Sequence, residues 1–314
     1  MRIGVVFPGQ GSQCVGMGYD VAMRSPAARA TFERASSLLG YDLLALQTNG
    51  PEEQLRETEY SQPAIFTTNL ALYRAAGDGV APTVTAGHSF AELCSLVIAK
   101  SLNFDEALHI VSERGKAMQA AAQQARGAMS AILGLDAERV REILRADGLS
   151  RVVLANFNSP TQIVISGDFD EVQTAGAAML GAGAKRVVPL NVSGAWHSPL
   201  MDPAVERLAA AVETSRFALP EFDVISNVDG RPYRDVNTIK SNLIRSVVDE
   251  VRWHDTAERL VSYGLDLVVE FGASGVLGAL MKRMSAAPPA IVVSDSAGID
   301  RLRLAIEGPA SANV

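Results

Sequence analysis

Short apolar runs alternate with helical-period segments along both ends of the chain. "RIGVVF" (2–7) stops at Pro8-Gly9, and "TVTAG" (83–87) leads into the helix-forming stretch 91–100. Brief β-branched runs bounded by Gly or Pro indicate buried strands, and strands that alternate with helices favour a parallel sheet. Further helices are expected over 26–47, 62–76, 103–125, 199–215, 240–264 and 274–284, and further strands over 222–228 and 266–272.

The middle of the chain has a different pattern. Four strand-like runs, at 127–135, 151–158, 161–167 and 185–192, enclose two helical stretches at 137–147 and 169–183. The order strand, helix, two strands, helix, strand is the ferredoxin-like arrangement. We therefore predict an α/β protein in which residues 126–192 form a small domain inserted into a large one made of 1–125 and 193–314, with a frayed tail from 307.

The composition narrows the class of protein. The chain has 314 residues, 48% of them hydrophobic and 20% charged, with a net charge of −7. An acidic balance argues against a broad nucleic-acid surface, which needs excess Lys and Arg. The two cysteines have no metal-ligand spacing, and neither a signal-peptide core nor an apolar run of membrane-spanning length occurs. We expect a cytoplasmic protein with no metal site.

The segment "AGHSFA" contains the first candidate for chemistry, Ser89. A nucleophile elbow, G-x-S-x-G, lies between a strand and a helix, and this context is predicted here. Ala91 replaces the final glycine, which is tolerable unless its φ angle is positive. The alternative is an ordinary loop in which Ser89 caps the next helix.

A serine nucleophile needs a base, and four histidines are available. His88 adjoins the serine, and adjacent side chains point apart. His109 lies within a helix, and His254 stands at a helix start. His197 ends the loop "VSGAWH" immediately before Ser198-Pro199, an N-cap followed by proline at N1. By elimination His197 is the best candidate base.

Two further segments leave alternatives open. The glycines of "FPGQGSQ" (7–13) allow the backbone to approach a ligand or a neighbouring segment closely, and Gln10 offers an amide donor. The segment matches no phosphate-binding motif, and a tight turn is the alternative explanation. In "SERGKAMQ", Arg114 is either a ligand for an anion or a surface arginine paired with Glu113.

These segments together resemble the malonyl-CoA:acyl carrier protein transacylases and the acyltransferase domains of polyketide synthases. The matching blocks occur in order over nearly the whole chain: "FPGQGSQ", "QPA" (62–64), "AGHSFAE", "SERGKAMQ", "GAMSAILGL", "NFNSPTQIVISG", "GAKR", "SGAWHSPLM", "SNVDG", "VRW" and "EFGASGVL". The resemblance implies an α/β-hydrolase-like core with a ferredoxin-like insertion. It favours a discrete, trans-acting enzyme.

The resemblance also implies roles for individual residues. Ser89 would attack an acyl-CoA thioester with His197 as base, and backbone N–H groups of Gln10 and Phe90 would hold the oxyanion. Arg114 would bind the malonyl carboxylate, for which a guanidinium fork is suited. Further substrate contacts are implied for Gln62, His88, Asn158 and Trp196. Lys185 and Arg186 either contact an acidic carrier protein or are simply solvated surface residues.

The implied partners are an acyl-CoA and an acyl carrier protein, which itself carries the phosphopantetheine, so no cofactor is expected. We expect a monomer that moves a malonyl-type unit onto the carrier. One alternative is an enzyme with the same catalytic residues that moves a different acyl group, including from one carrier protein to another. The others are an acyl hydrolase and a docking module without catalytic activity. Retention of Arg114 argues against the hydrolase, and retention of Ser89 and His197 argues against the docking module.

Four positions depart from the family pattern. Besides Ala91, Trp196 stands where malonyl-specific members commonly carry phenylalanine; it would either leave less room for an α-substituent or, if rotated, open another cavity. Ser246 replaces a glutamine whose neighbourhood orients the histidine, which is harmless only if that contact comes from the main chain. Ala273 replaces the proline of a "GPG" turn. Together they favour a specialised enzyme of a polyketide pathway.

Overall fold

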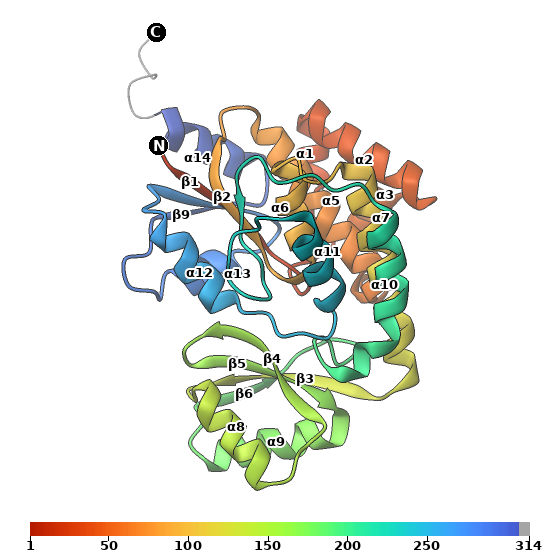
Figure 1. Ribbon diagram of the computed structural model, residues 1–314. Helices are drawn as coiled ribbons and strands as arrows, with labels where there is room; N and C mark the ends of the chain where they lie inside the picture. The colour runs from red at the N-terminus through yellow and green to blue at the C-terminus, as the bar shows by residue number, and fades with distance from the viewer. Residues whose placement is uncertain (308–314) are drawn as a thin grey trace.

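The computed structural model describes residues 1–307, so most of the tail expected to fray lies outside the described residues. Two sheets organise the chain (Figure 1). The larger one is entirely parallel, with the strand order β7-β2-β1-β8-β9. Its strands are β1 (Ile3–Phe7), β2 (Pro82–Gly87), β7 (Asp223–Val224), β8 (Leu267–Phe271) and β9 (Ala290–Val293).

Alternate side chains of the large sheet enter two different cores. Val5 and Phe7 of β1 pack into the main core, whereas Val6 faces a separate cluster around Trp253. A parallel sheet covered on both faces has such continuous apolar strands. The main core is formed with α1 (Tyr19–Arg24), α2 (Pro26–Leu39), α3 (Leu43–Asn49), α4 (Glu52–Arg56), α5 (Thr58–Ala76), α6 (Glu92–Ile98), α7 (Phe104–Gln124), α10 (Asp202–Thr214), α11 (Val236–Arg245) and α14 (Ser296–Glu307), and the other cluster with α12 (Trp253–Ser262) and α13 (Val276–Met281).

The smaller sheet is antiparallel and lies beyond one end of the large one (Figure 1). Its order β4-β5-β3-β6, with one helix after β3 and one after β5, is the expected ferredoxin-like topology, so the predicted fold class is confirmed. The boundaries at 126 and 192 stay predictions. Its elements are β3 (Gly127–Leu133), α8 (Ala137–Ala146), β4 (Val152–Ser159), β5 (Gln162–Asp168), α9 (Phe169–Gly181) and β6 (Arg186–Pro189).

The two faces of the small sheet have different partners. Ile132 and Ile165 pack with α8 and α9 in a core of their own. Met129, Ala131 and Val164 belong instead to the main core. Since side chains alternate along a strand, the same two strands serve both cores. The small sheet therefore presents an apolar face to the large subdomain.

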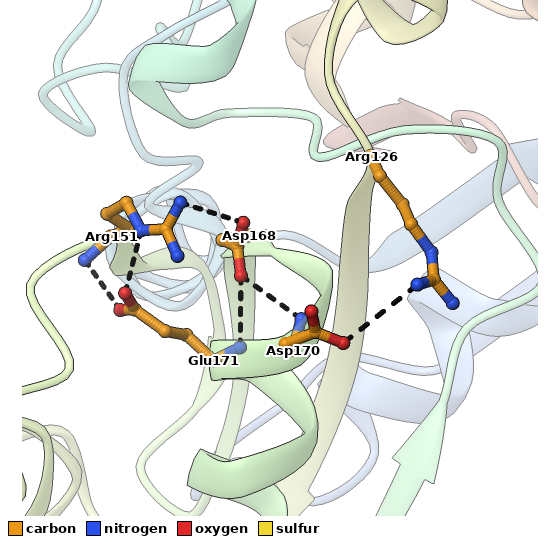
Figure 2. Close-up of polar contacts among 5 residues, drawn as sticks. All are labelled: Arg126, Arg151, Asp168, Asp170 and Glu171. Atoms are coloured by element: carbon orange, nitrogen blue, oxygen red, sulfur yellow. Dashed lines mark hydrogen bonds and ion pairs between the residues drawn. The ribbon is translucent and has the colours of Figure 1, made fainter.

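A cluster of charged groups ties the small sheet to the first turn of α9 (Figure 2). Asp168 caps that helix by accepting from the N–H groups of Asp170 and Glu171. Arg151, which precedes β4, donates from Nε to Glu171 at 2.7 Å and pairs with Asp168 at 3.0 Å. Arg126, before β3, lies 3.9 Å from Asp170. Exposed pairs contribute at most about 1 kcal/mol each, so this cluster fixes geometry more than stability.

The expected helix over 240–264 is wrong, because the structure has two helices there, α11 and α12. Between them, Val251 forms a parallel bridge with Asn156 of β4, and its N–H donates to the Ala155 carbonyl at 2.8 Å. Pairing with a strand from a distant part of the chain overrides the local helical period. The sequence reasoning also missed β9 and α14.

Within residues 1–307, none of the helices combines the length and the apolar character needed to cross a membrane.

Candidate active site

Ser89 lies on a sharp turn between β2 and α6. Its φ of 56° is left-handed, which a residue with a side chain rarely adopts. A Cβ on Gly87 would lie 2.0 Å from the Ala91 carbonyl oxygen, so glycine is required there. Ala91 itself has φ −67°, so no glycine is needed at that position. His88, not Ser89, is the N-cap residue of the short 3-10 helix Ser89–Ala91, which leaves the Ser89 hydroxyl free of a capping role.

The hydroxyl of Ser89 contacts His197. Ser89 Oγ and His197 Nε2 are 2.9 Å apart, and His197 Nδ1 lies 2.9 Å from the Asp249 main-chain oxygen. A carbonyl only accepts, so Nδ1 carries the proton and Nε2 is free to accept one from the serine. Burial and the nearby Arg114 cation lower the pKa of His197 to about 3, which keeps the ring neutral.

The histidine is oriented by main-chain atoms rather than by an acidic side chain. The backbone N–H of His197 donates to the Val247 carbonyl at 3.1 Å, and its ring Nδ1 contacts the Asp249 carbonyl. The Ser246 hydroxyl turns away and donates to the Leu243 carbonyl at 2.7 Å. The Ser246 side chain therefore makes no contact with His197, and the ring is held by main-chain carbonyls. The segment 246–252, where a continuous helix was expected, supplies these carbonyls.

The other histidines do not contact Ser89 Oγ. His88 Nε2 lies 3.3 Å from Asn158 Oδ1, its ring stacks obliquely on Trp253, and burial lowers its pKa to about 4. His109 is exposed on α7, and His254 Nε2 lies 3.5 Å from Glu258.

Arg114 is a buried cation beside the serine. Only 2% of its surface is exposed, and its Nη2 donates to Ser89 Oγ at 3.1 Å. Among the described residues no carboxylate lies within ion-pair distance of it, and its Nε has no hydrogen-bond partner. Burial lowers its pKa to about 9. Glu113, the alternative partner, instead pairs with Lys116 and Arg207. An unpaired buried cation is costly, and a bound anion would remove that cost.

The side chain of Gln10 is already engaged. Its Nε2 donates to Thr58 Oγ1 at 3.1 Å, and Gln62 Nε2 donates to its Oε1 at 3.4 Å. The side chain is thus held by protein contacts, and the oxyanion donor expected from the resemblance is the backbone N–H. Phe90 is in the first turn of a 3-10 helix, where N–H groups have no partner within the helix.

A cavity of about 280 Å³ is lined by Gln10, Ser89, Arg114 and His197, whereas Phe90 and Gln62 are outside its lining. Trp196, 4% exposed, forms part of its wall and packs so closely on Gly194 that a Cβ there would lie 2.7 Å from the indole. Ser274 brings the loop containing Ala273 to the lining. Lys185 and Arg186 are exposed and do not line it. The polar lining is Gln10, Ser12, His88, Ser89, Arg114, Asn156, Asn158, Gln162, His197 and Ser274, and the apolar wall includes Met118, Met129, Ala131, Val164, Leu190, Val192, Trp196, Val276, Leu277 and Leu280.

The sequence reasoning gave no role to three groups near the serine. Asn227, from the recognised block "SNVDG", accepts from the Ser89 N–H at 3.1 Å. Glu92, from "AGHSFAE", is buried behind it and accepts from Asn227. Both residues lie in sequence blocks that match the family, and this match could have identified them as site residues. The Asp249 carbonyl had no such signal, because a main-chain contact leaves no side-chain pattern.

The chain matches the acyl transferase domain family over residues 5–293. It is 42% identical to the malonyl CoA-acyl carrier protein transacylase of Escherichia coli K12, over 89% of this chain and 91% of that one. The corresponding protein of Haemophilus influenzae is 41% identical, over 95% and 97%. Among solved structures, the malonyl-transacylase PlMCAT, in complex with the type II polyketide synthase acyl carrier protein AntF, superposes with a TM-score of 0.91 at 40% identity, covering 98% of this chain and 99% of that one.

Fold, site geometry and full-length similarity agree: the chain belongs to the malonyl-CoA:acyl carrier protein transacylase family of acyltransferases.

Proposed function

We propose that this acyltransferase moves a malonyl group from CoA to the phosphopantetheine thiol of an acyl carrier protein through an ester on Ser89. The observation that carries the proposal is the buried, unpaired guanidinium of Arg114 within hydrogen-bond distance of a serine that also contacts a neutral histidine. A nucleophile, a base and a carboxylate receptor thus meet in one cavity.

In the first half-reaction, His197 Nε2 takes the proton of Ser89 Oγ as the oxygen attacks the thioester carbonyl. The carbonyl oxygen becomes an oxyanion, for which the backbone N–H groups of Gln10 and Phe90 are the donors we assign. The C–S bond then breaks, and the CoA sulfur leaves with the proton held by His197. The malonyl group remains as an ester on Ser89.

The second half-reaction reverses these steps with another thiol. The phosphopantetheine thiol gives its proton to His197, the sulfur attacks the ester carbonyl, and Ser89 Oγ leaves with that proton. Exchange of one thioester for another is nearly balanced in energy, whereas hydrolysis is downhill. The apolar wall around the ester, with Met129, Val164 and Trp196, limits access of water.

Arg114 gives the site its preference among acyl groups. A bidentate pair with the distal carboxylate of malonate would satisfy the guanidinium and draw Nη2 away from Ser89 Oγ. The closely packed Trp196 favours a second candidate, the same reaction with a narrower range of α-substituents or another cargo, including transfer between carrier proteins. We assign the carrier contact to Lys185 and Arg186, which are exposed and lie outside the cavity lining. A polyketide pathway is the proposed setting.

The test is intact-protein mass after separate incubation with malonyl-, methylmalonyl- and acetyl-CoA. We expect a malonyl adduct on the wild type and none on Ser89→Ala. An adduct that persists on Ser89→Ala would contradict the nucleophile. A Ser89 adduct with acetyl- but not malonyl-CoA would contradict the carboxylate receptor.

A further inference from the structure

We propose that Asn227 and Glu92 are positioning residues that hold Ser89 in its left-handed conformation, ready for attack. This inference rests on the role of Ser89 in the proposed function. Neither residue touches the Ser89 hydroxyl: Asn227 bonds the backbone on both sides of His88, and Glu92 acts through Asn227.

The amide of Asn227 spans the turn that carries the serine. Its Oδ1 accepts from the Ser89 N–H at 3.1 Å, and its Nδ2 donates to the Gly87 carbonyl at 2.6 Å. One planar side chain thus fixes the residues on both sides of His88. Asn227 lies 138 residues from Ser89 in the chain, so this is a tertiary clamp and not a local turn.

Glu92 fixes which way the Asn227 amide points. Its Oε2 accepts from both Nδ2 and the backbone N–H of Asn227, each at 2.7 Å. Its Oε1 accepts from the hydroxyl of Tyr233. A carboxylate accepts only, so Nδ2 must face Glu92 and Oδ1 must face Ser89. The three residues are at most 4% exposed, so their polar groups depend on one another for hydrogen bonds.

The clamp has two consequences for catalysis. A non-glycine residue keeps a positive φ only where its surroundings over-determine it, and the Ser89 φ of 56° is such a case. In addition, Asn227 occupies the Ser89 N–H, which leaves the oxyanion to the N–H of the next residue, Phe90. A serine released from the clamp would lose both its approach to His197 and the position of that donor.

The deciding variants are Asn227→Asp, which places a carboxylate oxygen against two acceptors, and Asn227→Ser, which deletes the amide without adding charge. Tyr233→Phe is the matched control, since it removes one bond of the same buried network but leaves both Asn227 contacts to the serine turn. Each is assayed for labelling of Ser89 by a fluorophosphonate, for kcat and KM with malonyl-CoA, and for melting temperature.

We expect both Asn227 variants to label about 100-fold more slowly and to lose kcat equally, with KM within about threefold, as a misplaced reacting group predicts. Tyr233→Phe should react within about threefold of wild type at a similar loss of melting temperature. Equal loss of labelling in Tyr233→Phe and the Asn227 variants, or unchanged labelling in a folded Asn227 variant, would overturn the proposal.

The labelling assay separates this inference from the cargo assignment. A fluorophosphonate has no carboxylate and does not need Arg114. Wild-type labelling at Ser89 without malonyl transfer would contradict the proposed cargo and leave the clamp supported by the variants. A wild type that is not labelled at Ser89 would overturn both.

Discussion

The positive charge of Arg114 lies at the wall of the cavity with Ser89 Oγ as a hydrogen-bond partner and, within the described part of the chain, no carboxylate in ion-pair contact. A cation in this state favours a ligand that brings its own negative charge. We therefore propose that the preference for a carboxylate-bearing acyl group depends on this one side chain.

We expect Arg114→Gln to lower kcat/KM for malonyl-CoA at least about 100-fold, because a buried charge-assisted pair contributes several times the thermal energy. The value for acetyl-CoA should change less than about tenfold, since acetyl has no carboxylate. Steady-state assays with both donors measure the two ratios. An equal loss for both would show that Arg114 serves Ser89 and not the acyl group.

Trp196 limits the cavity at a different point. Its indole is buried, packs directly on Gly194 and forms part of the cavity wall. Replacement by phenylalanine removes volume without adding a polar group.

Trp196→Phe should raise the ratio of methylmalonyl to malonyl loading by about tenfold, as expected for space equivalent to about one methylene. Competition between the two CoA thioesters, followed by intact mass, measures this ratio. An unchanged ratio would identify Trp196 as a packing residue, and Leu190→Ala, on the same wall, would then show whether the wall limits cargo at all.

At the scale of elements, two N-cap residues differ in their distance from the site: one begins α7 and the other begins the short helix that follows His197. Asn103 caps α7 by accepting from the Glu106 N–H at 2.9 Å, well away from the cavity. Ser198 caps Pro199–Met201 and also donates to the Ala195 carbonyl at 2.7 Å. It thereby braces the loop on which His197 adopts a φ of 58°.

Loss of the Asn103 cap in Asn103→Ala should cost about 1 kcal/mol of unfolding free energy, and Ser198→Ala should cost more, because the buried Ala195 carbonyl also loses its donor. Only Ser198→Ala should also lower kcat, by about tenfold or more, because the base loses its fixed position. Urea titration and turnover measure the two effects. Equal kcat in both variants would show that the Val247 and Asp249 contacts suffice to hold His197.

The elements that could be predicted from sequence are those whose pattern is local. β1, α7 and the βαββαβ order of the small sheet follow from runs of apolar residues and turn signals. The break between α11 and α12 could not, because it depends on pairing between Val251 and Asn156.

The same distinction applies to the site. Ser89 and His197 stand out by residue type and context, whereas Arg114 is singled out only through the family resemblance; the structure brings the three together. The Asp249 carbonyl that orients the base is common to every residue type, so no sequence pattern could mark it.

For the whole molecule, stability should fall on acidification because of His197. Its pKa is about 3 in the folded protein, against 6.5 for the ordinary side chain. Below pH 6.5 the histidine is protonated in the unfolded chain but stays neutral in the folded chain. Its contribution to the free energy of unfolding is therefore fully present above pH 6.5 and is lost as the pH falls toward 3.

Between pH 7 and pH 5 this amounts to about 2 kcal/mol of unfolding free energy. We expect His197→Gln to lose about that much less than wild type over the same interval, as measured by urea unfolding at both pH values. Other titrating groups contribute to both proteins and cancel in the comparison. Parallel losses in the two proteins would mean that the buried ring is not held neutral.

The alternation along β3 and β5 has a consequence for how such an enzyme can diversify. Ala131 and Val164 face the acyl cavity, whereas their neighbours Ile132 and Ile163 hold the small subdomain together. The reacting groups, Ser89 and His197, lie outside both strands. Substitutions on the cavity-facing side of these strands can therefore change which acyl group fits, one methyl group at a time. Such substitutions leave the residues that fold the small subdomain and the proposed nucleophile and base unchanged.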